Sequence, residues 1–245
     1  MNYFDPKEVF LVNDELKVQT IKLGGADTVL IIDNFYQYPE KISEIVRKSP
    51  APMWKNQDET RNFKEYYDCR HQWVFWDDPE FLDIFIKLAE HYYDVKASVP
   101  PDQTFATNCF QWIEDQPFGV VGNKSHADGP DKIAFNVFFN KEEECHGGTA
   151  IYRSKVSGSY RFSNDFDYME NIEELYEDGA SYYDPKWQEY WTIEHVLEMK
   201  YNRCVVYPGY MYHGAFHIEN NFKNFPRITQ TYFLKLTEDL EIPKL

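Results

Sequence analysis

The segment IAFNVFF, residues 133–139, decides the fold, because its side chains alternate with the period of an extended strand. Successive residues of a strand point to opposite faces of the sheet. One face therefore carries Ile133, Phe135, Val137 and Phe139. The other face carries Ala134, Asn136 and Phe138. This pattern predicts a strand on which Asn136 brings a polar group into a barrel, either as a satisfied structural amide or as a site residue.

Further strand patterns lie on both sides of this segment. TFATNCFQWIE, from residue 104, alternates in the same way, and residues 28–36 (TVLIIDNFY) form a short apolar run. Later candidates are GGTAIYR, RCVVYP and RITQTYFLKL. Helical patterns come before most of these strands. This order favours a mainly β (α+β) fold with antiparallel strands and flanking helices over alternating β-α units.

Two helices are expected in the first hundred residues. The first begins at Pro39, is ended by Pro50, and carries on one face Ile42, Ile45 and Val46. The second has Asp78 as its N-cap and Pro79 at its start. Its apolar positions keep helical spacing and are Phe81, Leu82, Phe85, Leu88 and Ala89.

Residues 153–200 break the strand pattern and are strongly acidic. They contain eleven acidic and five basic side chains, together with many aromatic rings. Helix is expected near 169–178 and over 185–199. Two interpretations remain open, a solvated and partly helical insertion or a lid over a site.

The composition narrows the class of protein. The chain has 245 residues, of which 41 are acidic and 25 basic, giving a net charge of −16. This charge argues against binding to nucleic acid or to an anionic membrane. No apolar run approaches the roughly 20 residues of a membrane span, and the N-terminus lacks the apolar core of a signal peptide. We expect one cytoplasmic domain over 1–245, with four reduced cysteines.

The segment Ser125-His126-Ala127-Asp128-Gly129 is a candidate metal-binding motif. On an extended segment His126 and Asp128 project to the same side, so one imidazole nitrogen and one carboxylate oxygen meet at one point. The alternative is a surface turn, since Asp-Gly-Pro is also typical of turns.

A second candidate ligand lies far along the chain. Residues 205–214 form a strand that runs into the turn Pro208-Gly209 and then delivers His213. Two histidines and one carboxylate form the facial triad of non-haem Fe(II) oxygenases, which leaves positions for a chelating cosubstrate and O₂. The other histidines lack such a pattern, and we do not expect them to bind metal.

Arg227 lies on the last predicted strand, on the same face as Thr229 and Thr231. An arginine inside a β-barrel needs a partner, because an unpaired buried charge is costly. A dicarboxylate cosubstrate would supply bidentate contacts to the guanidinium. The alternative is a surface arginine beside the strand.

The order of these motifs resembles the Fe(II)/2-oxoglutarate-dependent dioxygenase superfamily, and most closely its prolyl-4-hydroxylase-like branch. The resemblance covers residues 103–236 well and 28–100 loosely. It is carried by His126-Ala127-Asp128, the strand ending at Asn140, Gly147-Gly148-Thr149, Pro208-Gly209, His213 and Arg227.

The resemblance implies a double-stranded β-helix (jelly roll) core over 103–236, supported by residues 28–100, with 153–200 as an insertion. It implies that Fe(II) is bound by His126, Asp128 and His213. It assigns the cosubstrate 2-oxoglutarate to Arg227, with Thr229 adding a hydrogen bond. On the strand before the HxD motif, Gln111 and Asn108 are further candidates for cofactor contacts, while Trp112 is equally a core residue.

The implied activity is hydroxylation of a C–H bond in a prolyl or amino-acid-type substrate, peptide or small molecule, with release of succinate and CO₂. O₂ is the second cosubstrate, and ascorbate is expected as a reductant. Asp128 occupies the third ligand position, which argues against a halogenase. The alternative is a non-catalytic jelly-roll or cupin-like binding protein. The sequence does not indicate an oligomeric state.

Overall fold

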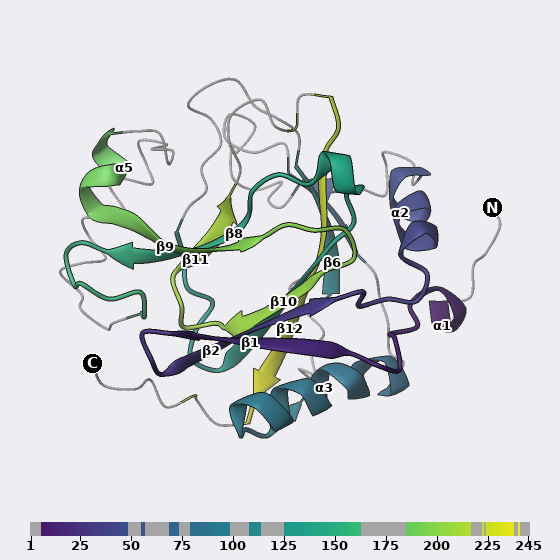
Figure 1. The fold of residues 1–245 in the computed structure, drawn as a ribbon, viewed down its shortest axis with the longest axis horizontal. Coiled ribbons are helices and arrows are strands. Elements are labelled where there is room, and N and C mark those ends of the chain that lie inside the picture. Colours follow the sequence, from purple (N-terminus) through teal and green to yellow (C-terminus); the bar gives the residue numbers. More distant parts are fainter. Residues whose placement is uncertain are drawn as a thin grey trace.

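The computed structural model describes residues 6–48, 55–56, 69–73, 79–98, 108–113, 125–162, 185–216, 222, 224–237 and 240 (Figure 1). Its helices are α1 (Pro6–Val9), α2 (Pro39–Lys48), α3 (Pro79–Tyr93) and α5 (Pro185–Tyr190), with a 3-10 turn at Glu142–Glu144. Its strands are β1 (Lys17–Leu23), β2 (Asp27–Asp33), β3 (Lys55–Asn56), β4 (Cys69–Trp73), β5 (Ala97–Ser98), β6 (Asn108–Ile113), β7 (Lys132–Phe138), β8 (Gly148–Ser154), β9 (Trp191–Glu198), β10 (Cys204–Pro208), β11 (His213–Phe216) and β12 (Arg227–Leu236).

The strands form two antiparallel sheets. The large sheet has the order β1-β2-β10-β7-β12-β6-β4-β3, with β5 paired to β12, and the small sheet has the order β11-β8-β9. After β7 the chain crosses to β8 and β9, returns to β10, crosses again to β11 and ends on β12. Alternation between two sheets is the pattern of a jelly roll. The predicted mainly β fold with a double-stranded β-helix core is confirmed.

Strand β7 has the two faces that its sequence predicts. Its outward residues Ile133, Phe135 and Val137 belong to an apolar cluster that includes the buried face of α3. Its inward residues Ala134 and Phe138 belong to a second cluster, which lies between the sheets. The central strand of the large sheet is therefore buried on both sides.

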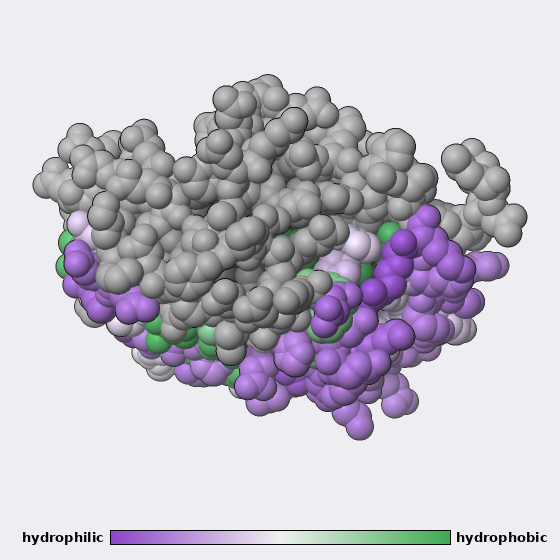
Figure 2. Space-filling view, turned by 90° about the horizontal axis from the view of Figure 1, so that it is seen from above, coloured by the Kyte–Doolittle hydropathy of each residue, from purple (hydrophilic) through white to green (hydrophobic). Residues whose placement is uncertain are grey.

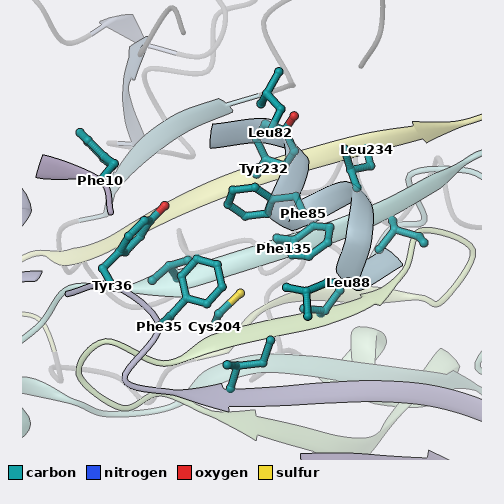
Figure 3. Close-up of a cluster of buried hydrophobic side chains, with 14 of the residues drawn as sticks. Phe10, Phe35, Tyr36, Leu82, Phe85, Leu88, Phe135, Cys204, Tyr232 and Leu234 are labelled. Atoms are coloured by element: carbon teal, nitrogen blue, oxygen red, sulfur yellow. The ribbon is translucent and has the colours of Figure 1, made fainter. Parts of the chain in front are cut away.

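The outward cluster contains several aromatic rings, which pack among aliphatic side chains (Figure 3). The ring of Phe85 on α3 lies 5.0 Å from the ring of Phe135 and 4.6 Å from that of Tyr232, measured between centroids. Edge-to-face and tilted contacts of this kind add to the free energy gained by burying the rings. They attach α3 to the outer surface of β7 and β12.

The two predicted N-terminal helices are present. In α2, Ile42 and Val46 are buried, and Ile45 packs partly buried against the outward cluster. In α3, the buried positions are Leu82, Phe85, Leu88 and Ala89. The predicted end at Pro50 and N-cap at Asp78 lie outside the described residues.

The helix predicted over 185–199 is wrong in its second half. The helix α5 ends at Tyr190, and the chain continues as strand β9, which pairs with β8 along its whole length. The pairing buries Trp191 and Leu197, so tertiary packing overrides the local helical preference. The helix predicted near 169–178 lies outside the described residues. Strand β1, with its polar and mostly exposed sequence, was not predicted.

The described part of the face shown in Figure 2 is mostly hydrophilic, with small hydrophobic areas beside it. This agrees with the net charge of −16. Among the described helices, none combines the length and apolar character that crossing a membrane requires.

Candidate metal centre

The HxD motif is held against the segment that carries His213. The backbone N–H of His126 donates to the carbonyl of His213 at 3.0 Å, and the N–H of His213 donates to the carbonyl of His126 at 2.8 Å. The N–H of Asp128 donates to the carbonyl of Gly209 at 2.7 Å. These backbone bonds align two parts of the chain that are distant in sequence.

The three predicted ligands lie together. His126, Asp128 and His213 each offer one ligand atom, and these atoms all lie within 4.8 Å of one another. His213 Nε2 is 3.3 Å from Asp128 Oδ2, and His126 Nε2 is 3.8 Å from Asp128 Oδ1. Within the described ranges, no other group of three such side chains converges in this way.

The donor set fits a divalent cation. His213 Nδ1 lies 2.8 Å from the carbonyl of Met211, so it donates its proton there and leaves the Nε2 lone pair directed at Asp128. Asp128 Oδ2 is buried and has no hydrogen-bond donor. Two acceptor atoms facing each other at 3.3 Å need a cation or a proton between them. Two imidazoles and one carboxylate are the set that suits Fe(II).

The electrostatics keep the carboxylate ionised. Burial opposes ionisation of Asp128, but the protonated forms of His213 and His126, together with Lys132, outweigh it and lower the pKa of Asp128 to about 2. Burial also opposes protonation of His213, yet Asp128 and the Met211 carbonyl raise the pKa of its imidazole. Asp128 therefore favours a cation beside it, either a protonated imidazole or a metal ion.

The centre is buried on one side and open on another. The side chain of His126 is 52% exposed, whereas those of Asp128 and His213 are 14% and 5% exposed. The exposed side of the centre is therefore the side of His126.

Arg227 points into the barrel. Only 2% of the residue is exposed, so the alternative of a surface arginine is wrong. Its Nη2 donates to the carbonyl of Gly148 at 3.1 Å, and its Nη1 donates to Thr229 Oγ1 at 3.5 Å. Thr229 Oγ1 in turn donates to Gln111 Oε1 at 3.4 Å. The structure thus brings three of the four predicted cosubstrate residues into one hydrogen-bonded row.

Asn108, the fourth of these residues, is placed only by its backbone. The register of β6 and β12 sets it opposite Tyr232, whereas Gln111 is opposite Thr229. Its side chain lies outside the described part, and its cosubstrate contact stays a prediction. Trp112 packs, partly buried, against the outward apolar cluster, as its core interpretation predicts.

Tyr207 is a site residue that the sequence analysis missed. Its ring centroid lies 4.7 Å from that of His213, and its hydroxyl accepts a hydrogen bond from Asn136 Nδ2 at 2.8 Å. Burial and the charge of Asp128 raise the pKa of Tyr207 well above its usual value, while Arg227 opposes this shift. The hydroxyl therefore stays protonated, and it interacts electrostatically with both Asp128 and Arg227. Its position beside Pro208-Gly209 was the available sequence signal.

Asn136 also connects this group to the small sheet. Its Nδ2 lies 3.4 Å from Thr149 Oγ1 on β8. Both hydrogen bonds satisfy the amide of Asn136 within the barrel, as its structural interpretation predicts, and its role as a site residue stays a prediction. Of the four cysteines, the structure describes the side chains of Cys145 and Cys204, and both are free thiols.

Comparisons with known proteins agree with this architecture. A model described as a family of unknown function (DUF6445) matches residues 113–229, which include the three candidate ligands and Arg227. No curated protein matches the chain.

Solved structures give the fold. A prolyl hydroxylase from Trichoplax adhaerens, in complex with a hypoxia inducible factor peptide fragment, is 10% identical, with a TM-score of 0.50 over 86% of this chain and 84% of its own. An N-substituted L-amino acid dioxygenase from Burkholderia ambifaria AMMD is 10% identical, with a TM-score of 0.46 over 94% of this chain and 100% of its own. The first likeness shows that the chain has the fold of the 2-oxoglutarate/Fe(II) dioxygenases, as the sequence resemblance predicts.

Proposed function

We propose that this chain, which has the fold of the Fe(II)/2-oxoglutarate-dependent dioxygenases, is an oxidoreductase of that kind that hydroxylates a C–H bond. The observation that carries the proposal is the convergence of His126, Asp128 and His213 within 4.8 Å, with a buried carboxylate oxygen that lacks a donor. A jelly roll needs no such group for its stability, since burying an unsatisfied carboxylate costs free energy.

His126, Asp128 and His213 would hold Fe(II), and Arg227 with Thr229 would bind the far carboxylate of 2-oxoglutarate. Bound iron would activate O₂, which is the oxidant: one oxygen atom would enter succinate as 2-oxoglutarate is oxidised and loses CO₂, and the other would enter the C–H bond of the substrate. The guanidinium is well suited to this role, because a planar cation recognises a carboxylate through two parallel hydrogen bonds.

The remaining residues of the site orient these groups and exclude water. The Met211 carbonyl fixes the tautomer of His213, so that Nε2 is the ligand atom. Asn136 Nδ2 donates a hydrogen bond to the hydroxyl oxygen of Tyr207. The hydroxyl can then donate its own proton to a carboxylate of the cosubstrate. The ring of Phe138 lies 5.5 Å from the guanidinium carbon of Arg227 and shields it.

The proposed substrate is a prolyl or amino-acid-type compound, either within a peptide or free. It would approach from the exposed side of His126. We also propose that residues of the acidic stretch 153–200 act as a lid, whose charge would favour a cationic or apolar substrate over an anionic one.

The test is turnover of 2-oxoglutarate by the purified chain with Fe(II), ascorbate and O₂. We expect succinate formation and O₂ uptake in the wild type, and neither in His126→Ala. His91→Ala is the matched control, since His91 is an exposed histidine on α3. A screen of peptides and amino acids for products that gain one oxygen atom then identifies the substrate. A wild-type chain that binds neither Fe(II) nor 2-oxoglutarate contradicts the proposal.

A further inference from the structure

Asp27, the first residue of β2, is a buried carboxylate that accepts hydrogen bonds from three side chains. Its Oδ2 accepts from Arg161 Nε at 2.6 Å and from the Tyr160 hydroxyl at 2.5 Å. Its Oδ1 accepts from the Tyr210 hydroxyl at 2.6 Å. Only 2% of Asp27 and 3% of Arg161 are exposed. A buried ion pair with both oxygens satisfied holds its partners in one geometry, and removing one partner is costly.

The turn between β1 and β2 closes directly over this group. The Tyr160 hydroxyl lies 2.9 Å from the carbonyl of Leu23. Gly24 has a φ of +53°, and a Cβ at this position would lie 2.6 Å from the Tyr160 hydroxyl oxygen. A glycine allows both the left-handed backbone and the close approach of the ring.

The partners of Asp27 pair with the segment that carries the metal ligands. The N–H of Phe162 donates to the carbonyl of Tyr210 at 2.7 Å, and the N–H of Tyr212 donates to the carbonyl of Tyr160 at 2.9 Å. Between them, Arg161 and Met211 form a β-bridge. Asp27 is thus connected to residues 209–213 both through its own bond to Tyr210 and through the chain at 160–162.

Residues 209–213, which we call the ligand segment, orient two of the three candidate ligands. The Met211 carbonyl accepts the Nδ1 proton of His213, and the Gly209 carbonyl accepts the backbone N–H of Asp128. A shift of the ligand segment would therefore turn the imidazole of His213 and move the backbone of Asp128 together.

The other end of β2 provides a comparison within the same strand. Asp33, its last residue, pairs with Arg203 Nε at 2.6 Å and with Lys200 Nζ at 3.0 Å. These partners lie in the turn before β10, not in the ligand segment. Both ends of β2 therefore carry an aspartate–arginine pair, but only the pair at Asp27 is joined to the metal centre.

We propose that Asp27 is a positioning residue for the metal centre, which fixes the ligand segment through Tyr210 and Arg161 and thereby sets the directions of His213 and Asp128. This inference rests on the proposed function, because it requires that the triad binds metal. It adds a residue that lies far from the ligands in sequence and outside the region 113–229. Removing a group that orients a metal ligand typically lowers the metal affinity by about 10- to 100-fold.

The experiment compares the metal binding of Asp27→Asn, Tyr210→Phe and the control Asp33→Asn with that of the wild type. Fe(II) affinity is measured by competition with a chelator, and the visible absorption of bound Co(II) reports the coordination geometry. We expect Asp27→Asn to bind Fe(II) up to about 100-fold more weakly, and Tyr210→Phe about 10-fold more weakly. Both should change the Co(II) spectrum, whereas Asp33→Asn should retain the wild-type spectrum and affinity.

The outcomes separate this inference from the proposed function. A wild type that binds neither Fe(II) nor Co(II) contradicts the proposed function itself. A wild type that binds metal, with Asp27→Asn and Tyr210→Phe equal to it in affinity and spectrum, overturns only the positioning role of Asp27. If these variants have a lower melting temperature but the Co(II) spectrum of the wild type, the positioning role of Asp27 is likewise overturned. If Asp27→Asn does not fold, Tyr210→Phe decides, because it removes one hydroxyl and leaves the ion pair intact.

Discussion

The two faces of the large sheet are made by the same strands but have different contents. On β12 the outward side chains Ile228, Tyr232 and Leu234 pack in the apolar cluster beneath α3. The inward side chains Arg227 and Thr229 belong to the hydrogen-bonded row of the site. One strand thus supplies stability on one face and candidate chemistry on the other.

This separation follows from the period of a strand, since neighbouring residues never share a face. Polar groups on the inner face do not disturb the aromatic packing outside, and aromatic packing outside fixes the backbone from which the polar groups project. Substitutions on the outer face should therefore change the free energy of unfolding, and those on the inner face should change ligand binding.

The largest effect is expected from Phe135→Ala on the outer face. Removing a fully buried ring between Phe85 and Tyr232 leaves a cavity, and such changes cost about 3–5 kcal/mol of unfolding free energy. Denaturant unfolding measures this loss. At a temperature where the variant is folded, its 2-oxoglutarate affinity should equal that of the wild type, and a large loss of affinity would contradict the separation of the faces.

The next effect is expected from Arg227→Ala on the inner face. Truncating one partner of a buried charge-assisted contact costs about 2–5 kcal/mol of binding free energy, so 2-oxoglutarate affinity should fall by at least about 30-fold. Calorimetry with the metal-loaded protein measures it, while Fe(II) affinity should stay unchanged. Arg203→Gln, which alters an arginine paired with Asp33, is the control. Equal 2-oxoglutarate affinity in Arg227→Ala and the wild type would contradict the cosubstrate role.

The sequence predicted the faces well because local periodicity determines them. The alternation of residues 133–139 and the parity of Arg227 and Thr229 are properties of a few neighbouring residues, and burial confirms them. The convergence of His126 with His213 was accessible only through a motif order that resembles a known family, because no local rule brings distant segments together.

What the sequence did not predict depends on contacts between distant segments. The sequence predicts a helix where strand β9 lies, because the pairing of β9 with β8 is not visible in its own residues. The surroundings of Tyr207 are not visible in its own segment, because they depend on Asn136 and His213 on other strands. The group around Asp27 joins β2 to residues 160–162 and 210–212, and no spacing in the sequence indicates it.

A smaller effect is expected from Tyr207→Phe, which removes only the hydroxyl of an inner residue. One hydrogen bond to a charged group contributes about 1.5 kcal/mol, so 2-oxoglutarate affinity should fall by about tenfold, with Fe(II) affinity unchanged. Tyr93→Phe is a matched control, since the Tyr93 hydroxyl donates to the carbonyl of Val206, the neighbour of Tyr207 on β10. The same loss in both variants would mean that Tyr207 acts on stability and not on the cosubstrate.

The smallest effect is expected from Tyr36→Phe, which removes a hydroxyl from the outer side. The Tyr36 hydroxyl donates to Gln230 Oε1 at 2.7 Å, and Gln230 lies on β12 between the inward residues Thr229 and Thr231. Losing this bond should lower the unfolding free energy by about 1 kcal/mol, as measured by denaturant unfolding. Because Gln230 has the parity of the outer face, affinity for 2-oxoglutarate should not change. A loss of affinity here would show that the two faces are coupled through the backbone of β12.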